Sequence, residues 1–331
     1  MVAQLDRKYI KTRPLKTWSR LISYALFEGR PLTTKGRWIN PLVFGVYKAF
    51  SHLPKFRTID KPIFILGTGR SGSTVLGKVL SMHKDLEFLN EPKALWAYLH
   101  NQEDLMGSYN NGTGRYRLEQ SDASADIIKK AHRIFAGSLM VTGQKRFVDK
   151  YPELIFRTSF VSKIFPDAQY IFLTRNVDST CTSISYWSER KGTKERDGTA
   201  DWWGLNNRKW DALLEELLPE HDDLMAHFDE IRGLNEEGKA AIEWVVTMRE
   251  GIKLSKENPN KFIYLPYDEL CANSAEWINK LSEFLHLPND SIFQKYASET
   301  LLEPAKHGRV QLPTWLRKIT DTIERDLEAL K

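Results

Sequence analysis

Apolar positions along the chain form two alternating patterns, short continuous runs and longer stretches with helical spacing. The short runs are rich in residues that favour β-strands and lie at residues 63–66, 147–148, 170–173 and 262–265. The longer stretches repeat apolar residues every three or four positions and predict helices at residues 74–82, 154–164, 177–187, 236–256 and 274–285. Because strands separated by helices favour a parallel sheet, we expect an α/β fold with a central parallel sheet and helices on both faces.

Two stretches interrupt this alternation and are predicted to be insertions. Residues 101–120 are rich in Asn, Gly, Tyr and Arg, and residues 188–235 contain several glycines and the pair Trp202-Trp203. Insertions at strand ends often supply substrate contacts. The two tryptophans therefore have two interpretations, an aromatic wall for a substrate or a local core, and the core is favoured.

Charge divides the chain into two parts. Residues 1–59 contain twelve Lys and Arg against two acids, whereas the whole chain of 331 residues has a net charge of +5, so the remainder is mildly acidic. We expect residues 1–59 to be a basic N-terminal extension packed on one domain of residues 60–331. The acidic body disfavours a nucleic-acid-binding protein. With 41% apolar residues, the chain can fill a large core.

Within the extension, basic residues alternate with apolar ones. On a helix, Trp18, Leu21, Ile22 and Ala25 fall on one face with cations beside it. Two interpretations fit this pattern. We favour a helix that packs on the body with its lysines in water, and the alternative is a helix at a membrane surface.

Cys181 and Cys271 stand far apart, without a CxxC motif or a cluster of possible metal ligands. A disulfide scaffold and a structural zinc site are therefore disfavoured. The first eighteen residues lack the pattern of a signal peptide, and the nearby apolar run at residues 41–47 is too short to cross a bilayer. We expect a cytoplasmic protein, with peripheral membrane contact through the basic extension as the alternative.

The first predicted strand leads into the glycine-rich segment Gly67-Thr68-Gly69-Arg70-Ser71-Gly72-Ser73-Thr74, which opens a helix. A strand, a glycine loop and a helix N-terminus can cradle a phosphate with backbone N–H groups. The glycine spacing fits a Walker A motif, but the lysine that contacts the β- and γ-phosphates is missing. This absence disfavours an NTPase or kinase, and Arg70 is the cation within the loop.

A second candidate lies where the strand at residues 170–173 ends. Arg175 follows this strand, and Ser183 lies two helical turns further on. Both can face the carboxyl edge of a parallel sheet, where ligands bind in this fold class. A guanidinium and a hydroxyl suit a second phosphate group, although an arginine at a strand end is as often part of a surface salt bridge.

Together these elements resemble the sulfotransferases that use 3′-phosphoadenosine 5′-phosphosulfate (PAPS), over most of residues 60–330. The arginine in the loop is similar to the branch that contains bacterial small-molecule and tyrosylprotein sulfotransferases. The segments around residues 243–256, 262–270 and 281–288 also resemble that family. The resemblance implies a P-loop nucleotide-kinase-like sulfotransferase fold. It implies that the 5′-phosphosulfate is bound by Arg70, Ser71, Gly72, Ser73 and Thr74, and the 3′-phosphate by Arg175 and Ser183, with Tyr267 at the cofactor site.

The same resemblance implies catalytic residues. The branch has an acidic base some twenty residues after the loop arginine, a position that Glu91 occupies. It also has a lysine in a Lys-x-Pro segment before a helix, which Lys150 matches. Glu91 would take the proton of the acceptor hydroxyl, and Lys150 and Arg70 would stabilise the charge on the transferred group. His100 is the reserve base, because other relatives use a histidine.

Near the C-terminus, a glycine-bearing segment resembles the one that closes over the 3′-phosphate in the family. Its residues are Lys306, His307, Gly308 and Arg309. Related enzymes also use an arginine four residues after the helical serine, but here that position is Trp187, and Arg190 is the nearest substitute. The third phosphate contact therefore has two candidate sources.

The sequence thus predicts a sulfotransferase that moves a sulfuryl group from PAPS, as co-substrate, to a hydroxyl or amine and releases adenosine 3′,5′-bisphosphate, without a metal. The expected acceptor is a small molecule, lipid, glycan or peptide, because no motif in the insertions selects among them. The alternatives are a P-loop kinase-like phosphotransferase and a non-catalytic nucleotide-binding protein.

Overall fold

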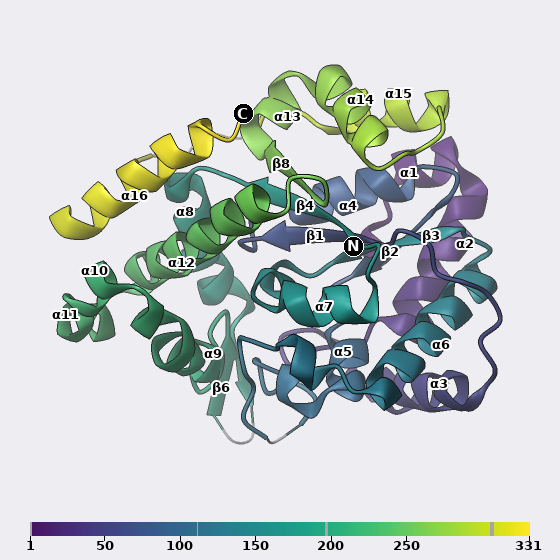
Figure 1. Cartoon of the computed structure of the whole chain (residues 1–331), viewed down its shortest axis with the longest axis horizontal. Coiled ribbons are helices and arrows are strands. Elements are labelled where there is room, and N and C mark those ends of the chain that lie inside the picture. Colours follow the sequence, from purple (N-terminus) through teal and green to yellow (C-terminus); the bar gives the residue numbers. More distant parts are fainter. Residues whose placement is uncertain (1, 111, 196–197, 305–307) are drawn as a thin grey trace.

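The computed structural model describes residues 2–110, 112–195, 198–304 and 308–331, and it contains a central five-stranded sheet (Figure 1). The strand order is β2-β3-β1-β4-β8, and every neighbouring pair is parallel. The strands are β1 (Ile63–Gly67), β2 (Leu86–Asn90), β3 (Arg146–Lys150), β4 (Gln169–Thr174) and β8 (Phe262–Pro266). The predicted parallel sheet is confirmed, and β2 is a strand that the apolar pattern did not reveal.

Helices cover both faces of this sheet, as the alternation of strands and helices predicts. On one face lie α1 (Arg7–Thr12), α4 (Ser73–Ser81), α13 (Tyr267–Ala272), α14 (Ser274–Phe284) and α15 (Ser291–Thr300). On the other lie α3 (Asn40–His52), α5 (Lys93–Leu99), α6 (Ala125–Thr142), α7 (Thr158–Ile164), α8 (Val177–Lys191), α12 (Glu236–Glu257) and α16 (Thr314–Glu328). The expected layers of an α/β domain are thus present.

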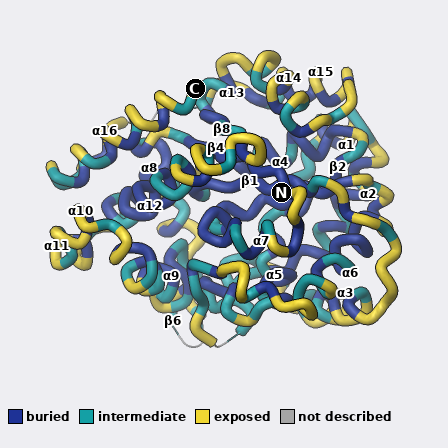
Figure 2. The backbone as a smooth tube through the Cα atoms, viewed as in Figure 1, coloured by how far each residue is buried: buried dark blue, intermediate teal, exposed yellow. Residues whose placement is uncertain are grey.

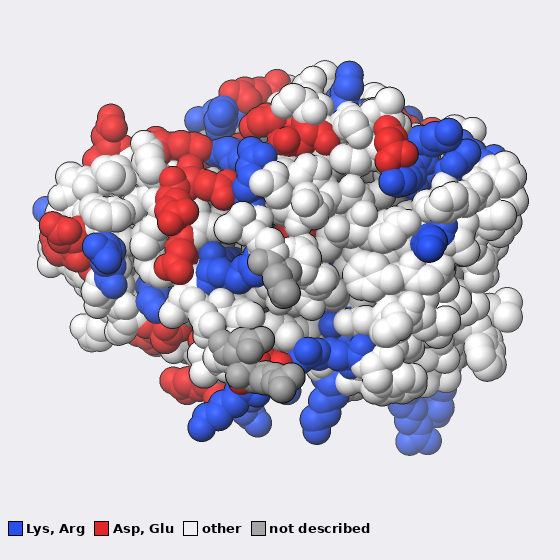
Figure 3. Space-filling view, turned by 90° about the horizontal axis from the view of Figure 1, so that it is seen from below, with Lys and Arg blue, Asp and Glu red and all other residues white. Residues whose placement is uncertain are grey.

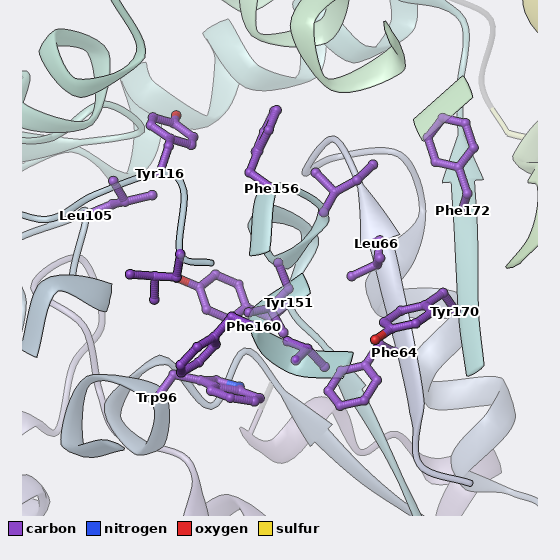
Figure 4. Packing of buried hydrophobic residues seen from close by; sticks show 14 of the residues in the cluster. Phe64, Leu66, Trp96, Leu105, Tyr116, Tyr151, Phe156, Phe160, Tyr170 and Phe172 are labelled. Carbon is purple, nitrogen blue, oxygen red and sulfur yellow. The ribbon is translucent and has the colours of Figure 1, made fainter. Parts of the chain in front are cut away.

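Each face of β1 packs into its own hydrophobic core. Side chains alternate between the faces of a strand, so Ile63 and Ile65 join the core beneath α4 and α14, while Phe64 and Leu66 join the opposite core. The second core is rich in aromatic residues that meet near the sheet (Figure 4). In this core the ring of Phe64 stacks on Tyr170, with centroids 5.7 Å apart. Figure 2 shows the strands buried and much of α16 exposed.

The two predicted insertions add small elements at one end of the body. Residues 101–120 contain only short 3₁₀ turns in their described part. The second insertion contains an antiparallel sheet of β5 (Thr193–Glu195), β6 (Gly198–Asp201) and β7 (Gly204–Leu205), followed by α9 (Arg208–Ala212), α10 (Asp222–Met225) and α11 (Phe228–Arg232).

Figure 3 shows that Asp and Glu concentrate on the left half of the face that it displays.

The N-terminal extension contacts the body in the opposite orientation to the one expected. In α2 (Pro14–Ile22) the cations point inward: Lys16 Nζ donates to the carbonyl of Leu86, and Arg20 pairs with Glu28 at 2.6 Å. Trp18 instead is 68% exposed. The prediction of a helix with its lysines in water was therefore wrong, because buried carbonyl and carboxylate oxygens supply partners for these cations.

No helix in the described part of the chain combines the length and the apolar character that crossing a bilayer requires.

Candidate active site

A candidate residue lies at or near the carboxyl end of each of the five strands of the sheet. Glu91 directly follows β2, Lys150 ends β3, and the loop around Arg70 follows β1. Arg175 follows β4, and Tyr267 follows β8. Because the strands are parallel, these residues meet at one edge of the sheet, as expected for this fold class.

The glycine loop between β1 and α4 has the close approaches that a phosphate cradle needs. Gly72 has a φ of +88°, and a Cβ atom there would lie 2.2 Å from Cε2 of Tyr267. Arg70 also adopts a positive φ of 69°, a strained conformation for a residue with a side chain. The loop therefore places the first turn of α4 and the guanidinium of Arg70 at the same hollow.

Two hydroxyls of this loop, those of Thr68 and Ser71, are buried without a partner in the described part of the chain. Ser71 is fully buried, and its Oγ forms no hydrogen bond within the described part of the chain. A buried polar group without a partner costs free energy unless a ligand or water satisfies it. Together with the N-terminus of α4, which favours anions, this hydroxyl makes the loop suited to a phosphate or sulfate group.

The two predicted phosphate-binding elements are joined by a side-chain contact. Arg70 Nε donates a hydrogen bond of 3.1 Å to Oγ of Ser183 on α8. Burial lowers the pKa of Arg70 from its usual value, although the nearby carboxylate of Glu91 opposes this shift. Arg175 lies with its guanidinium 5.8 Å from the ring centre of Tyr267 and its Nε 3.9 Å from Asp268. The cations of the two elements therefore border a single hollow.

The candidate base and the candidate lysine form an ion pair. Lys150 Nζ donates to Oε1 of Glu91, and the backbone N–H of Glu91 donates to the carbonyl of Lys150 at 2.8 Å. Lys150 is almost fully buried, whereas the side chain of Glu91 is 38% exposed. Glu91 has a positive φ of 52°, which turns its side chain at the end of β2.

Further charges extend this pair into the second core. Lys93 Nζ lies 3.7 Å from Glu91 and donates to Glu153 at 3.0 Å. Lys209 then links Glu153, at 3.4 Å, to Glu243, at 2.5 Å. Alternating signs along this network offset part of the free-energy cost of burying its charges.

The electrostatic effect of this network on the candidate base has a clear direction. Burial would raise the pKa of Glu91, but the positive charges of Lys150 and Lys93 outweigh burial and lower it. Burial likewise opposes the charge of Lys93, yet Glu153 and Glu91 raise its pKa. Glu91 is therefore an ionised carboxylate at neutral pH and can accept a proton.

These residues surround a hollow of about 430 Å³, here called the phosphate hollow. It brings together most residues that the sequence singles out. They are Arg70, Gly72, Ser73, Thr74, Glu91, Lys150, Arg175, Ser183 and Tyr267. Ser71 is buried in the same loop. A neighbouring hollow between β8 and α16 also has Arg175 in its wall, but five carboxylates line it and make it less suited to phosphate.

Other candidates lie elsewhere or cannot be placed. Lys306 and His307 fall outside the described residues. Arg309 is exposed and lies 3.6 Å from Asp321 on α16, and Gly308 has open space around it, so neither lines the phosphate hollow. His100 packs edge-on against Phe160, also away from this hollow.

Several site residues were not predicted. Lys93 directly follows the Glu-Pro segment, and Glu153 directly follows the Lys-Tyr-Pro segment. Their position next to these motifs could have indicated that they belong to the site. Lys209 gave no such signal. The two tryptophans differ in position. Trp202 lines the phosphate hollow, as an aromatic wall would, whereas Trp203 is completely buried, as a core residue would be.

Within the ranges that the structure describes, no group of three or more His, Cys, Asp or Glu residues could hold a metal ion.

This chain is similar in sequence to known sulfotransferases. The model of the sulfotransferase family matches residues 62–231. Protein-tyrosine sulfotransferase 1 of Danio rerio is 22% identical over 292 residues, which cover 82% of this chain and 70% of the relative. The protein-tyrosine sulfotransferase of Drosophila melanogaster is 22% identical over 80% of this chain, and the match spans 49% of the fly protein.

Solved structures also include similar chains. The sulfotransferase STF9 from Mycobacterium avium is 14% identical and has a TM-score of 0.47, with 88% of this chain and 81% of that chain covered. The family match covers just over half of the residues. The glycine loop, the parallel sheet and the family match together show that this chain is a member of the sulfotransferase family.

Proposed function

We propose that this chain transfers a sulfuryl group from PAPS to a hydroxyl or amine of an acceptor and releases adenosine 3′,5′-bisphosphate. The observation that carries the proposal is the phosphate hollow, where the anion-suited loop, two arginines and the Glu91–Lys150 pair meet. A donor with a phosphosulfate and a separate phosphate needs several cationic groups, and this hollow supplies them.

The residues present fit the donor in two places. The loop at residues 70–74, with the unpartnered Ser71 hydroxyl and the start of α4, would hold the 5′-phosphosulfate. Arg175 and Ser183 would hold the 3′-phosphate on the β4–α8 side. Tyr267, packed against Gly72, would form a wall between them.

The transfer step then has a group for each change in charge. The acceptor oxygen forms a bond to sulfur as the bond from sulfur to the bridging phosphate oxygen breaks, and that oxygen keeps the electron pair. Glu91 receives the proton of the acceptor hydroxyl. Lys150 and Arg70 stabilise the negative charge that grows on the bridging oxygen and the sulfuryl group.

The similarity to two protein-tyrosine sulfotransferases adds one acceptor candidate, the hydroxyl of a protein tyrosine. A kinase-like transferase is the alternative function. The loop has Ser73 at the Walker lysine position, so this alternative lacks the cation that such enzymes use on the β- and γ-phosphates.

Thermal unfolding with ligands tests the donor. Adenosine 3′,5′-bisphosphate should raise the Tm without magnesium, because a ligand that binds only the folded state stabilises it. ATP with Mg²⁺ should give little change. Stabilisation by ATP with Mg²⁺ alone would overturn the proposal in favour of a phosphotransferase.

Transfer of labelled sulfate to an acceptor panel tests the base. Glu91→Gln should abolish transfer and keep the stabilisation by adenosine 3′,5′-bisphosphate, whereas the exposed control Glu215→Gln should change neither. Unchanged turnover in Glu91→Gln would remove Glu91 from the role of base.

A further inference from the structure

The phosphate hollow continues past the candidate base toward the N-terminal extension. A narrow neck of about 70 Å³ shares Gly69, Glu91, Trp187 and Trp202 with the phosphate hollow. The neck in turn shares Thr33 and Trp187 with a wider depression of about 910 Å³, here called the outer hollow. The three hollows therefore adjoin one another between Glu91 and the surface, and together they are here called the path.

Two tryptophans set the width of this path. The rings of Trp187 and Trp202 meet edge to face with their centroids 5.5 Å apart. Trp202 is fixed, because its Nε1 donates to Glu243 at 2.7 Å. A Cβ atom at Gly69 would lie 2.4 Å from this ring, so the loop and the tryptophan are already in close contact. The small volume of the neck therefore suits a slender group rather than a bulky one.

The outer hollow is cationic. Among the described residues that line it, four are cationic and none is acidic. They are Lys35, Arg37, Arg190 and Lys191. Arg37 donates to Glu195 at 2.7 Å, so one of the four charges is balanced from outside the hollow. The excess of positive charge should attract anions to this end of the path.

The loop that supplies two of these cations is held at both ends. The backbone N–H of Arg30 donates to Oδ1 of Asn40 at 2.8 Å, and Nδ2 of Asn40 donates to the carbonyl of Arg30 at 2.9 Å. Between these ends, the N–H of Leu32 donates to Ser108 at 3.3 Å. The segment 31–39 is thus a closed loop on the body, and its cations lose less freedom on binding than those of an open tail.

From the path, its charge and the held loop, we propose that the outer hollow binds a negatively charged group of the acceptor. This inference rests on the proposed sulfotransferase function and names its acceptor class. The acceptor would carry a carboxylate, phosphate or sulfate that Lys35, Arg37, Arg190 and Lys191 bind. Its hydroxyl would pass the two tryptophans and reach Glu91. The N-terminal extension would therefore select the acceptor, through residues 32–37.

Binding of small probes to protein saturated with adenosine 3′,5′-bisphosphate tests this proposal, since the nucleotide keeps the probes out of the phosphate hollow. The probes are phenylacetate, phenyl phosphate, phenyl sulfate and the uncharged benzyl alcohol. We expect at least one anionic probe to bind about tenfold more tightly than benzyl alcohol, and the preference to weaken at high salt. Comparison of the three anions identifies the group.

Variants locate the binding. The double variant Lys35→Ala/Arg190→Ala should lose the preference for anions, whereas Lys48→Ala, an exposed lysine of α3 that does not line the outer hollow, should keep it. Equal binding of charged and neutral probes, or a preference that the double variant leaves unchanged, would overturn the proposal. Failure of the nucleotide to bind at all would instead contradict the proposed function.

Discussion

Arg70 Nε donates to Ser183 Oγ at 3.1 Å, so a residue of the glycine loop contacts a residue of α8 that lies 113 positions further along the chain. This contact joins the elements proposed to hold the two ends of the donor.

Loss of the Ser183 hydroxyl should weaken nucleotide binding. Ser183→Ala removes one hydrogen bond to a charged phosphate, so we expect the Kd for adenosine 3′,5′-bisphosphate to rise about tenfold or more. Titration calorimetry measures this change. The control Ser185→Ala lies on the same helix but does not line the phosphate hollow, and its Kd should stay unchanged. Equal affinities for both variants would contradict the role of Ser183.

Loss of Lys93 should shift the acid limb of the pH–rate profile. Glu91 must be ionised to accept a proton, and the charge of Lys93 contributes to its lowered pKa. Lys93→Met removes this charge and raises the pKa of Glu91, so kcat should begin to fall at a higher pH than in the wild type. The control Lys129→Met, at an exposed lysine of α6, should leave the profile in place. A limb that does not move, or moves to lower pH, would contradict the network.

Asp290 should stabilise the fold in a pH-dependent way. Burial opposes its ionisation, but Arg13 and two backbone N–H groups outweigh burial and lower the pKa of Asp290 to about 2. Because this folded-state pKa lies below the ordinary value of 3.8, the stabilisation is complete above about pH 4 and is lost as the pH falls toward 2. The shift corresponds to about 2 kcal/mol.

Asp290→Asn should therefore lower the free energy of unfolding by about 2 kcal/mol at pH 7. Urea unfolding between pH 7 and pH 3 should show the difference from wild type shrinking at the acid end. Asp126→Asn, an exposed carboxylate on α6, serves as the control and should have little effect. A difference that stays constant with pH would show that the charge of Asp290 is not its source.

The outward face of α2 should contribute to membrane binding. Leu15 and Trp18 are 82% and 68% exposed. Lys8 and Lys11, on the neighbouring helix α1, border a shallow surface depression. Apolar side chains beside cations suit a surface of anionic lipid. Leu15→Ser/Trp18→Ser should reduce sedimentation with anionic vesicles several-fold, while Leu302→Ser, also exposed, should not. Identical sedimentation of both variants would exclude this face.

Local pattern determined much of the fold and part of the site. Short apolar runs predicted β1, β3, β4 and β8, because a strand buried on both faces favours apolar side chains. The apolar pattern did not predict β2, because β2 contains a buried charged residue. Glu87, its second residue, is buried, accepts hydrogen bonds from the hydroxyls of Ser23 and Ser138, and has a pKa that burial raises to about 7. Those partners lie some fifty or more residues away, so a local pattern could not indicate them.

The candidate site residues also divide into those that the sequence could indicate and those that only the tertiary structure could. Arg70, Glu91, Lys150 and Arg175 could be named from sequence because each sits at a strand end or in a motif next to one, and parallel strands bring such ends together. Tertiary structure alone decided that Lys209 joins their charge network and that the segment 31–37 borders the path to Glu91.

The N-terminal extension shows the physical reason most clearly. By itself the sequence determined that α2 has a cationic side and an apolar side. It could not determine which side faces inward, because that depends on acceptors outside the helix: the carbonyl of Leu86 for Lys16, and Glu28 and the carbonyl of Phe88 for Arg20. Periodicity determines which residues share a face of a helix, and only the partners supplied by the folded chain decide where that face points.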